Sequence, residues 1–142
     1  MKKPEETLGY LLNDVARLIR SEFHKRIECS TFTQAQARAL VYVARIEGIR
    51  QVQLAELLEI QPITLARMID QLEQAGLVER RQSPNDRRAY ELYVTPAAAP
   101  HLEKIRAIGN ALRADALQGV SENDAAVVFE VLRKMRRNLT GH

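Results

Sequence analysis

Several residue types that support common protein chemistries are scarce in this sequence. The 142 residues include one cysteine, no tryptophan and six glycines. A single cysteine excludes an intrachain disulfide and favours a reducing, cytoplasmic setting. The sequence also has no Gly-rich phosphate loop, no Gly-x-Ser-x-Gly elbow and no paired cysteine motif. We therefore expect neither an enzyme nor a cofactor-binding protein.

Long apolar runs are missing as well. No segment approaches the roughly 20 consecutive apolar residues that a membrane helix requires. The start, Met-Lys-Lys-Pro-Glu-Glu, leads into an amphipathic stretch instead of a signal-peptide core. Hydrophobic residues nevertheless make up 46% of the chain, which is enough for the core of one globular domain. The sequence thus predicts a single domain over residues 1–142, with no membrane partner.

Apolar residues recur at three- and four-residue steps over most of the chain, which predicts helices. The first is a long helix within residues 5–30. Thr33 and Gln36 have the spacing of a capping box and begin a second helix, which ends just before Gly48. A short third helix covers about residues 52–58.

Three later helices are marked by their ends. Pro62 suits a first helical turn and Gly76 suits the left-handed position after a last turn, so a helix is expected between them. The Thr-Pro pair at 95–96 begins a fifth helix, whose start Pro100 should make irregular. Ser121 caps a sixth helix.

After the fourth helix, apolar residues recur at every second position, as in a β-strand. Residues 77–81 and 89–95 predict two strands, and the Ser-Pro-Asn-Asp sequence within 82–88 is typical of a turn. These segments form a hairpin, the only sheet that the sequence predicts. In residues 80–88 four arginines stand against one aspartate, so this segment alone has a formal charge of +3, equal to that of the whole chain.

This order of elements predicts a mostly α fold with a small β-hairpin, a winged helix-turn-helix. Residues 33–95 would form the DNA-binding lobe. Residues 5–30 and 96–140 would form N- and C-terminal dimerisation helices, because their apolar stripes are too long for one small core to cover.

The fourth helix is the candidate for insertion into a major groove. Its predicted outward residues are Thr64, Arg67, Met68 and Gln71. Arg67 can bridge O6 and N7 of guanine. Gln61 and Pro62 lie at the start of this helix, whose positive dipole end favours phosphate.

The hairpin tip is the candidate for a minor groove, where the potential is strongly negative. Arg87 and Arg88 would enter the groove, and we expect Asp86 to hold an arginine by a charge-assisted hydrogen bond. The alternative for each of these arginines is an ordinary solvated side chain.

Three ordered parts of the sequence resemble the multiple-antibiotic-resistance regulator (MarR) family. They are residues 54–58, residues 64–80, and the Asp-Arg-Arg sequence at 86–88 followed by 92–96. The wing sequence looks closest to the SlyA-like branch. The resemblance implies a homodimer that places both recognition helices and both wings on a pseudo-palindromic DNA operator. It also implies repression or displacement of a nucleoid silencer.

The resemblance further implies a crevice for small phenolic or other aromatic anions, to which His24, Arg38 and Tyr42 could contribute. The alternative for each of the three is an ordinary core or surface role, which we favour because a lone polar residue on a helix usually has a local partner. Cys29 is expected to be an inert thiol instead of a redox sensor. His24 and Glu28 have i,i+4 spacing but lack further ligands, so no metal site is expected.

A winged helix used only for protein contacts is the competing function, because a fold does not fix its function. DNA binding predicts an affinity for duplex that falls steeply with salt, whereas a protein-only module predicts none.

Overall fold

The computed structural model describes residues 3–27 and 32–141, so Cys29 and Glu28 lie outside the described residues. The elements are α1 (Leu8–Ile27), α2 (Gln34–Arg45), β1 (Ile49–Arg50), α3 (Gln51–Leu58), α4 (Pro62–Gln74), β2 (Val78–Ser83), β3 (Asp86–Val94), the 3-10 turn η1 (Pro96–Ala98), α5 (Ala99–Ala116) and α6 (Glu122–Leu139). This is the mostly α winged helix-turn-helix that the sequence predicts.

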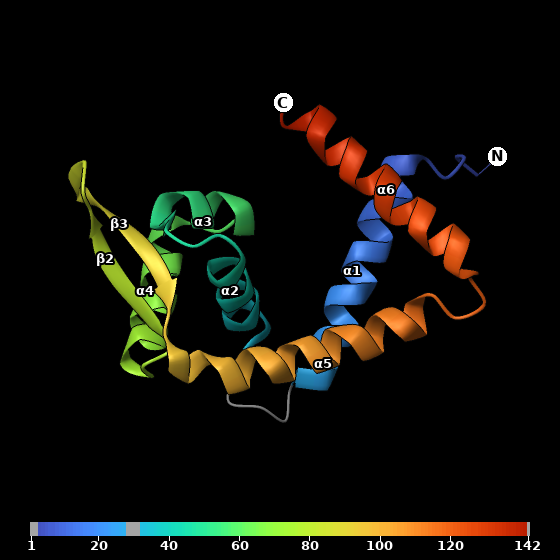
Figure 1. Ribbon diagram of the computed structural model, residues 1–142. Coiled ribbons are helices and arrows are strands. Elements are labelled where there is room, and N and C mark those ends of the chain that lie inside the picture. The colour runs from blue at the N-terminus through green and yellow to red at the C-terminus, as the bar shows by residue number, and fades with distance from the viewer. Residues whose placement is uncertain (1–2, 28–31, 142) are drawn as a thin grey trace.

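The molecule is extended along α5 (Figure 1). The β2–β3 ribbon lies at one extremity with α2, α3 and α4 beside it, and α1 and α6 lie toward the other extremity. Helix α5 runs between the two ends and packs against both α1 and α2.

A single cluster of buried apolar residues holds α2, α3, α4 and the sheet together. Its fully buried members include Leu40 from α2, Leu54 from α3, Ile69 from α4 and Leu92 from β3. Burial of each such side chain contributes about 1.5–3 kcal/mol relative to exposure. The relative position of α4 and β3, which carry the predicted reading residues, is therefore set by this core.

The ends of α2 and α6 follow the capping signals in the sequence. The hydroxyl of Thr33 accepts a hydrogen bond from the backbone N–H of Gln36, and the Gln36 side chain accepts one from the N–H of Thr33. The Ser121 hydroxyl likewise accepts from the N–H of Asp124. Each bond satisfies a donor that the first helical turn leaves free.

The start of α5 is irregular, as Pro100 predicts. The 3-10 turn η1 precedes the α-helix, and Pro100 stands in the first turn, where a missing N–H breaks no helical bond. Thr95 does not cap this turn with its side chain. Its hydroxyl instead donates to the carbonyl of Gly76 at 2.5 Å, which ties the end of the sheet to the end of α4.

The sheet has three antiparallel strands in the order β1-β3-β2, one more than the sequence predicts. Strand β1 is only two residues long and pairs Ile49 with Leu92 and Arg50 with Glu91. A strand of two residues is too short to show an alternation of apolar and polar residues, so the sequence does not predict it. Gly48, at a φ of +80°, makes the turn into β1.

The hairpin strands are also longer than expected. Gln82 and Ser83 belong to β2 and residues 86–88 belong to β3, so only Pro84 and Asn85 form the turn. The pairing is regular from Val78–Val94 outward and shifts between Gln82 and Ser83. Strand pairing therefore continues almost to the tip of the ribbon.

Candidate nucleic-acid interface

Helix α4 has one buried face and one exposed face. Buried residues at steps of three and four place the first face on the core; they are Leu65, Met68, Ile69 and Leu72. Gln61, Pro62, Thr64, Arg67 and Gln71 are exposed, as predicted for a helix that presents its outer face.

Met68 is the exception among the predicted outward residues. It is only 8% exposed and belongs to the core cluster. It stands three residues after Leu65 and four before Leu72, a spacing that places all three on one side of the helix. The prediction that Met68 lies on the outward side of α4 is therefore wrong, and its flexible thioether packs in the core instead.

The beginning of α4 leaves backbone donors free. Gln61 is the N-cap residue, but its side chain makes no capping hydrogen bond, and Pro62 follows in the first turn. The next N–H groups point outward along the axis, and with the helix dipole they make a favourable position for a phosphate oxygen. Farther along the helix, Gln71 is engaged, because its side-chain oxygen accepts a hydrogen bond from Gln36 of α2 at 2.8 Å.

The β2–β3 hairpin, residues 78–94, is the wing of this fold and carries exposed cations at its outer end. Arg87 and Arg88 are exposed on β3, and within residues 3–27 and 32–141 neither of them, nor Arg67, forms an ion pair. Such guanidinium groups remain available to a phosphate or a base edge. The carbonyl of Arg87 accepts from the Gln82 side chain at 2.8 Å, which braces the strand beneath them.

Asp86 does not hold an arginine side chain, contrary to expectation. Its carboxylate accepts a hydrogen bond from the backbone N–H of Arg88 at 3.0 Å. An aspartate commonly bonds the main chain two residues later where the chain leaves a turn. Asp86 thus shapes the backbone at the base of the tip and leaves the guanidinium groups free.

A small cavity of about 330 Å³ lies where the wing meets the helix-turn-helix. Pro62 at the start of α4 and both Asp86 and Arg88 of the wing line it. Arg50, the exposed residue just before α3, lines it too. Sequence reasoning missed Arg50, because its proximity to Arg88 depends on the pairing of β1 with β3.

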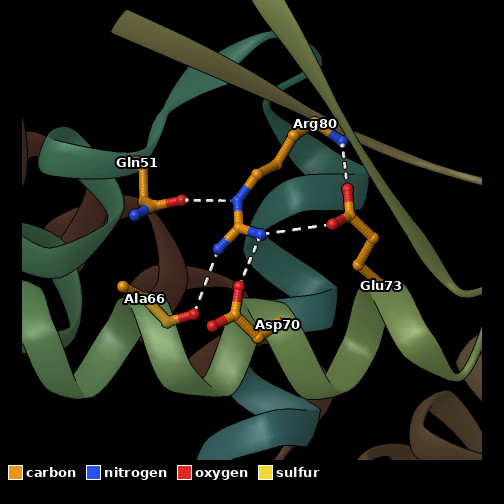
Figure 2. Close-up of polar contacts among 5 residues, drawn as sticks. All are labelled: Gln51, Ala66, Asp70, Glu73 and Arg80. Atoms are coloured by element: carbon orange, nitrogen blue, oxygen red, sulfur yellow. Dashed lines mark hydrogen bonds and ion pairs between the residues drawn. The ribbon is translucent and has the colours of Figure 1, made fainter. Parts of the chain in front are cut away.

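Arg80 belongs to the cationic segment 80–88 of the sequence, but its side chain is bonded to α3 and α4 and not directed to the hairpin tip (Figure 2). Its guanidinium donates to Asp70 at 2.7 Å, to Glu73 at 3.2 Å, to the Gln51 side chain at 3.0 Å and to the Ala66 carbonyl at 3.1 Å. Its side chain is 17% exposed. Arg80 therefore joins β2 to both α4 and α3 and is not free to contact DNA.

Arg81 is also occupied. It forms an ion pair with Glu79 at 3.2 Å, and its guanidinium carbon lies 4.0 Å from the centre of the Tyr93 ring. The hydrogen bond with Glu79 raises the pKa of Arg81 above its ordinary value. The Tyr93 hydroxyl donates to Glu91 at 3.0 Å, and this bond raises the pKa of Tyr93. Of the four arginines in residues 80–88, only the outer two are thus unpaired in the described chain.

A larger cavity of about 900 Å³ lies among α1, α2 and α5. Arg38 and Tyr42 line it, whereas His24 is exposed on α1 and is not among its lining residues. The lining is largely apolar and contains no carboxylate among the described residues. Five arginines also line it: Arg20, Arg38, Arg45, Arg106 and Arg113.

Neither a metal site nor a membrane-spanning helix is found in the described part of the chain. Residues 3–27 and 32–141 contain no cluster of three or more histidine, cysteine, aspartate or glutamate side chains that could hold a metal ion. None of the described helices combines the length and apolar character needed to cross a bilayer.

Comparison with known proteins identifies relatives. The family model of the MarR family matches residues 32–90. The crystal structure of the transcriptional regulator PA3341 is 34% identical over 96% of this chain and 100% of that one, with a TM-score of 0.80. Wild-type MarR from E. coli is 25% identical over 94% of this chain and 98% of its own, with a TM-score of 0.79.

The transcriptional regulator SlyA is also among the similar structures, in keeping with the wing sequence. It is 27% identical, covers 92% of each chain and has a TM-score of 0.73. These similarities span the flanking helices as well as the central lobe. This chain belongs to the MarR family of winged helix-turn-helix transcription regulators.

Proposed function

We propose that this chain is a repressor that binds a pseudo-palindromic DNA operator as a homodimer and leaves it when a small aromatic anion binds. Residues 33–95 form the DNA-binding lobe, and residues 5–30 and 96–140 form the dimerisation region. The proposal rests chiefly on three exposed arginines without ion pairs in the described chain: Arg67 on the outer face of α4 and Arg87 and Arg88 on the wing.

Arg67 and the wing arginines have different tasks in this proposal. Arg67, with Thr64 and Gln71 beside it, contacts base edges in the major groove. Arg88 and Arg87 enter the adjacent minor groove, while Gln61 and Pro62 place the helix start against a phosphate. Because the minor groove presents nearly the same pattern for different sequences, loss of Arg88 lowers affinity for most duplexes, whereas loss of Arg67 relaxes sequence preference.

Duplexes selected from a random pool by the purified protein provide the test, with binding measured by fluorescence anisotropy at several salt concentrations. Arg67→Ala should reduce discrimination at one base pair by roughly tenfold, in line with a bidentate contact. Arg88→Ala should flatten the dependence of affinity on salt by about one unit of slope. Lys104→Ala, an exposed cation of α5, is the control. Salt-independent or absent duplex binding by the parent would instead favour the protein-only module.

Dimerisation is supported by the apolar surface of α1 and α6. Helix α6 has no buried residue. Its large apolar residues that remain exposed are Val127, Val128, Phe129, Val131, Leu132 and Leu139, and those of α1 are Leu8, Tyr10, Leu11, Leu12, Val15, Leu18 and Ile19. Exposed apolar side chains in such number on two helices ordinarily mark a contact with another chain. A two-fold dimer places two half-sites about one helical turn apart on the DNA.

Sedimentation velocity tests the dimer. Leu132→Glu inserts a charge into the apolar face of α6 and should convert the dimer to a monomer. Glu130→Gln, which removes a charge from an exposed position of the same helix, is the control. A dimer that survives Leu132→Glu at micromolar concentration would move the interface elsewhere.

Release by a ligand is supported by the larger cavity. Its apolar walls suit an aromatic ring, and its arginines suit a carboxylate or phenolate. Salicylate, a small phenolic acid, is the probe for calorimetric titration. Arg38→Ala should weaken salicylate binding severalfold, and His24→Ala should not. Equal affinities of the parent and Arg38→Ala would remove this cavity from the proposal.

A further inference from the structure

The most exposed large apolar residue of the described lobe stands on α4, the helix that we propose to enter the major groove. Ile63 is 67% exposed, more than Val52, Leu57, Ile46 or Tyr90, the other exposed large apolar side chains described between residues 32 and 95. It is the second residue of α4, directly after Pro62. Single exposed apolar residues are common on protein surfaces, so the position of Ile63 and not its exposure alone is informative.

Ile63 lies on the face of α4 that points away from the core. It is four residues before Arg67, and residues four apart stand one above the other on the same face. The buried Leu65, Ile69 and Leu72 occupy the opposite side. Any duplex close enough to bond Arg67 therefore also meets Ile63, one turn nearer the helix start.

The major groove offers one apolar group on its base edges, the C5-methyl group of thymine. Isoleucine is branched at Cβ and has one preferred χ1 rotamer in a helix, so contact with a methyl group costs little side-chain entropy. We infer that Ile63 reads the C5-methyl group of a thymine in each operator half-site, beside the base read by Arg67. This inference rests on the proposed DNA binding and adds a specificity-determining residue to it.

Replacement of thymine by deoxyuridine tests the inference, because it removes only the methyl group. Each thymine of the selected operator is replaced in turn, and affinity is measured for the parent protein and for Ile63→Ala. At one thymine of each half-site the parent should bind the uridine duplex about fourfold more weakly, the effect of one buried methyl group. Ile63→Ala should bind the thymine and uridine duplexes equally.

Ile46→Ala is the matched control, because Ile46 is an exposed isoleucine of the same lobe at the end of α2. It should keep the parent's preference for thymine. Ile63 is exposed, so its substitution leaves the core intact. A parent that shows no methyl-sensitive position, or an Ile63→Ala variant that keeps the full preference, overturns the role of Ile63 while salt-dependent binding persists. Failure to select any duplex overturns the proposed function together with it.

Discussion

Replacement of Arg80 by methionine should lower the free energy of unfolding by about 3 kcal/mol, because four side-chain contacts are lost. The bonds to the Gln51 side chain and the Ala66 carbonyl contribute about 1 kcal/mol each. The ion pairs with Asp70 and Glu73 contribute about 0.5 kcal/mol each, because both carboxylates are well exposed to water. Methionine retains an unbranched apolar stem and removes all four of these contacts.

Urea unfolding followed by circular dichroism, at one protein concentration for every variant, measures the effect. Arg81→Met is the matched control, since Arg81 is the next residue of the same strand and its side chain is 54% exposed. It should lower the unfolding midpoint less than Arg80→Met does. Arg80→Lys keeps the charge but lacks the planar fork, so it should recover only part of the loss. If Arg80→Met is no less stable than Arg81→Met, the Arg80 contacts do not hold β2 to α4.

Other substitutions probe the fold in the same assay. Gly48→Ala should destabilise by about 1–3 kcal/mol, because Gly48 has a positive φ and a new Cβ would lie 3.0 Å from the Tyr93 hydroxyl; a neutral result would contradict the close approach. Met68→Ala should cost about 2–4 kcal/mol as a core truncation, and Arg67→Ala should change stability by less than about 0.5 kcal/mol; the reverse order would restore Met68 to the outer face. The raised pKa of Tyr93 means that its bond to Glu91 stabilises the fold below pH about 10 and is lost as pH rises through the folded pKa, so Tyr93→Phe should reduce the loss of stability in that alkaline range.

Much of the fold could be predicted because its signals are local. The Thr33 capping box, Pro62, Gly76 and the Ser121 cap each act within a few residues of where they stand. Each one marks a helix end by satisfying or omitting a particular backbone bond. The helix boundaries therefore follow from the sequence with little help from tertiary structure.

The missed strand and the misplaced Arg80 both depend on contacts between distant segments. Strand β1 exists only because Gly48 and Ile49 meet Leu92 more than 40 positions later in the chain. The role of Arg80 depends on acceptors from α3 and α4, and no pattern within 80–88 distinguishes it from Arg88. The formal charge of residues 80–88 overstates the number of arginines available to DNA, because Asp70 and Glu73 of α4 pair with Arg80.

The two-residue turn at Pro84 and Asn85 affects when the wing becomes ordered. A seven-residue loop at this place would have to lose its conformational freedom on reaching the groove, at about 1–2 kcal/mol for each backbone residue fixed. Strand pairing up to Ser83 and Asp86 fixes most of those residues when the protein folds. The wing is therefore preorganised, and the free energy of its proposed contacts with DNA can appear almost entirely as affinity.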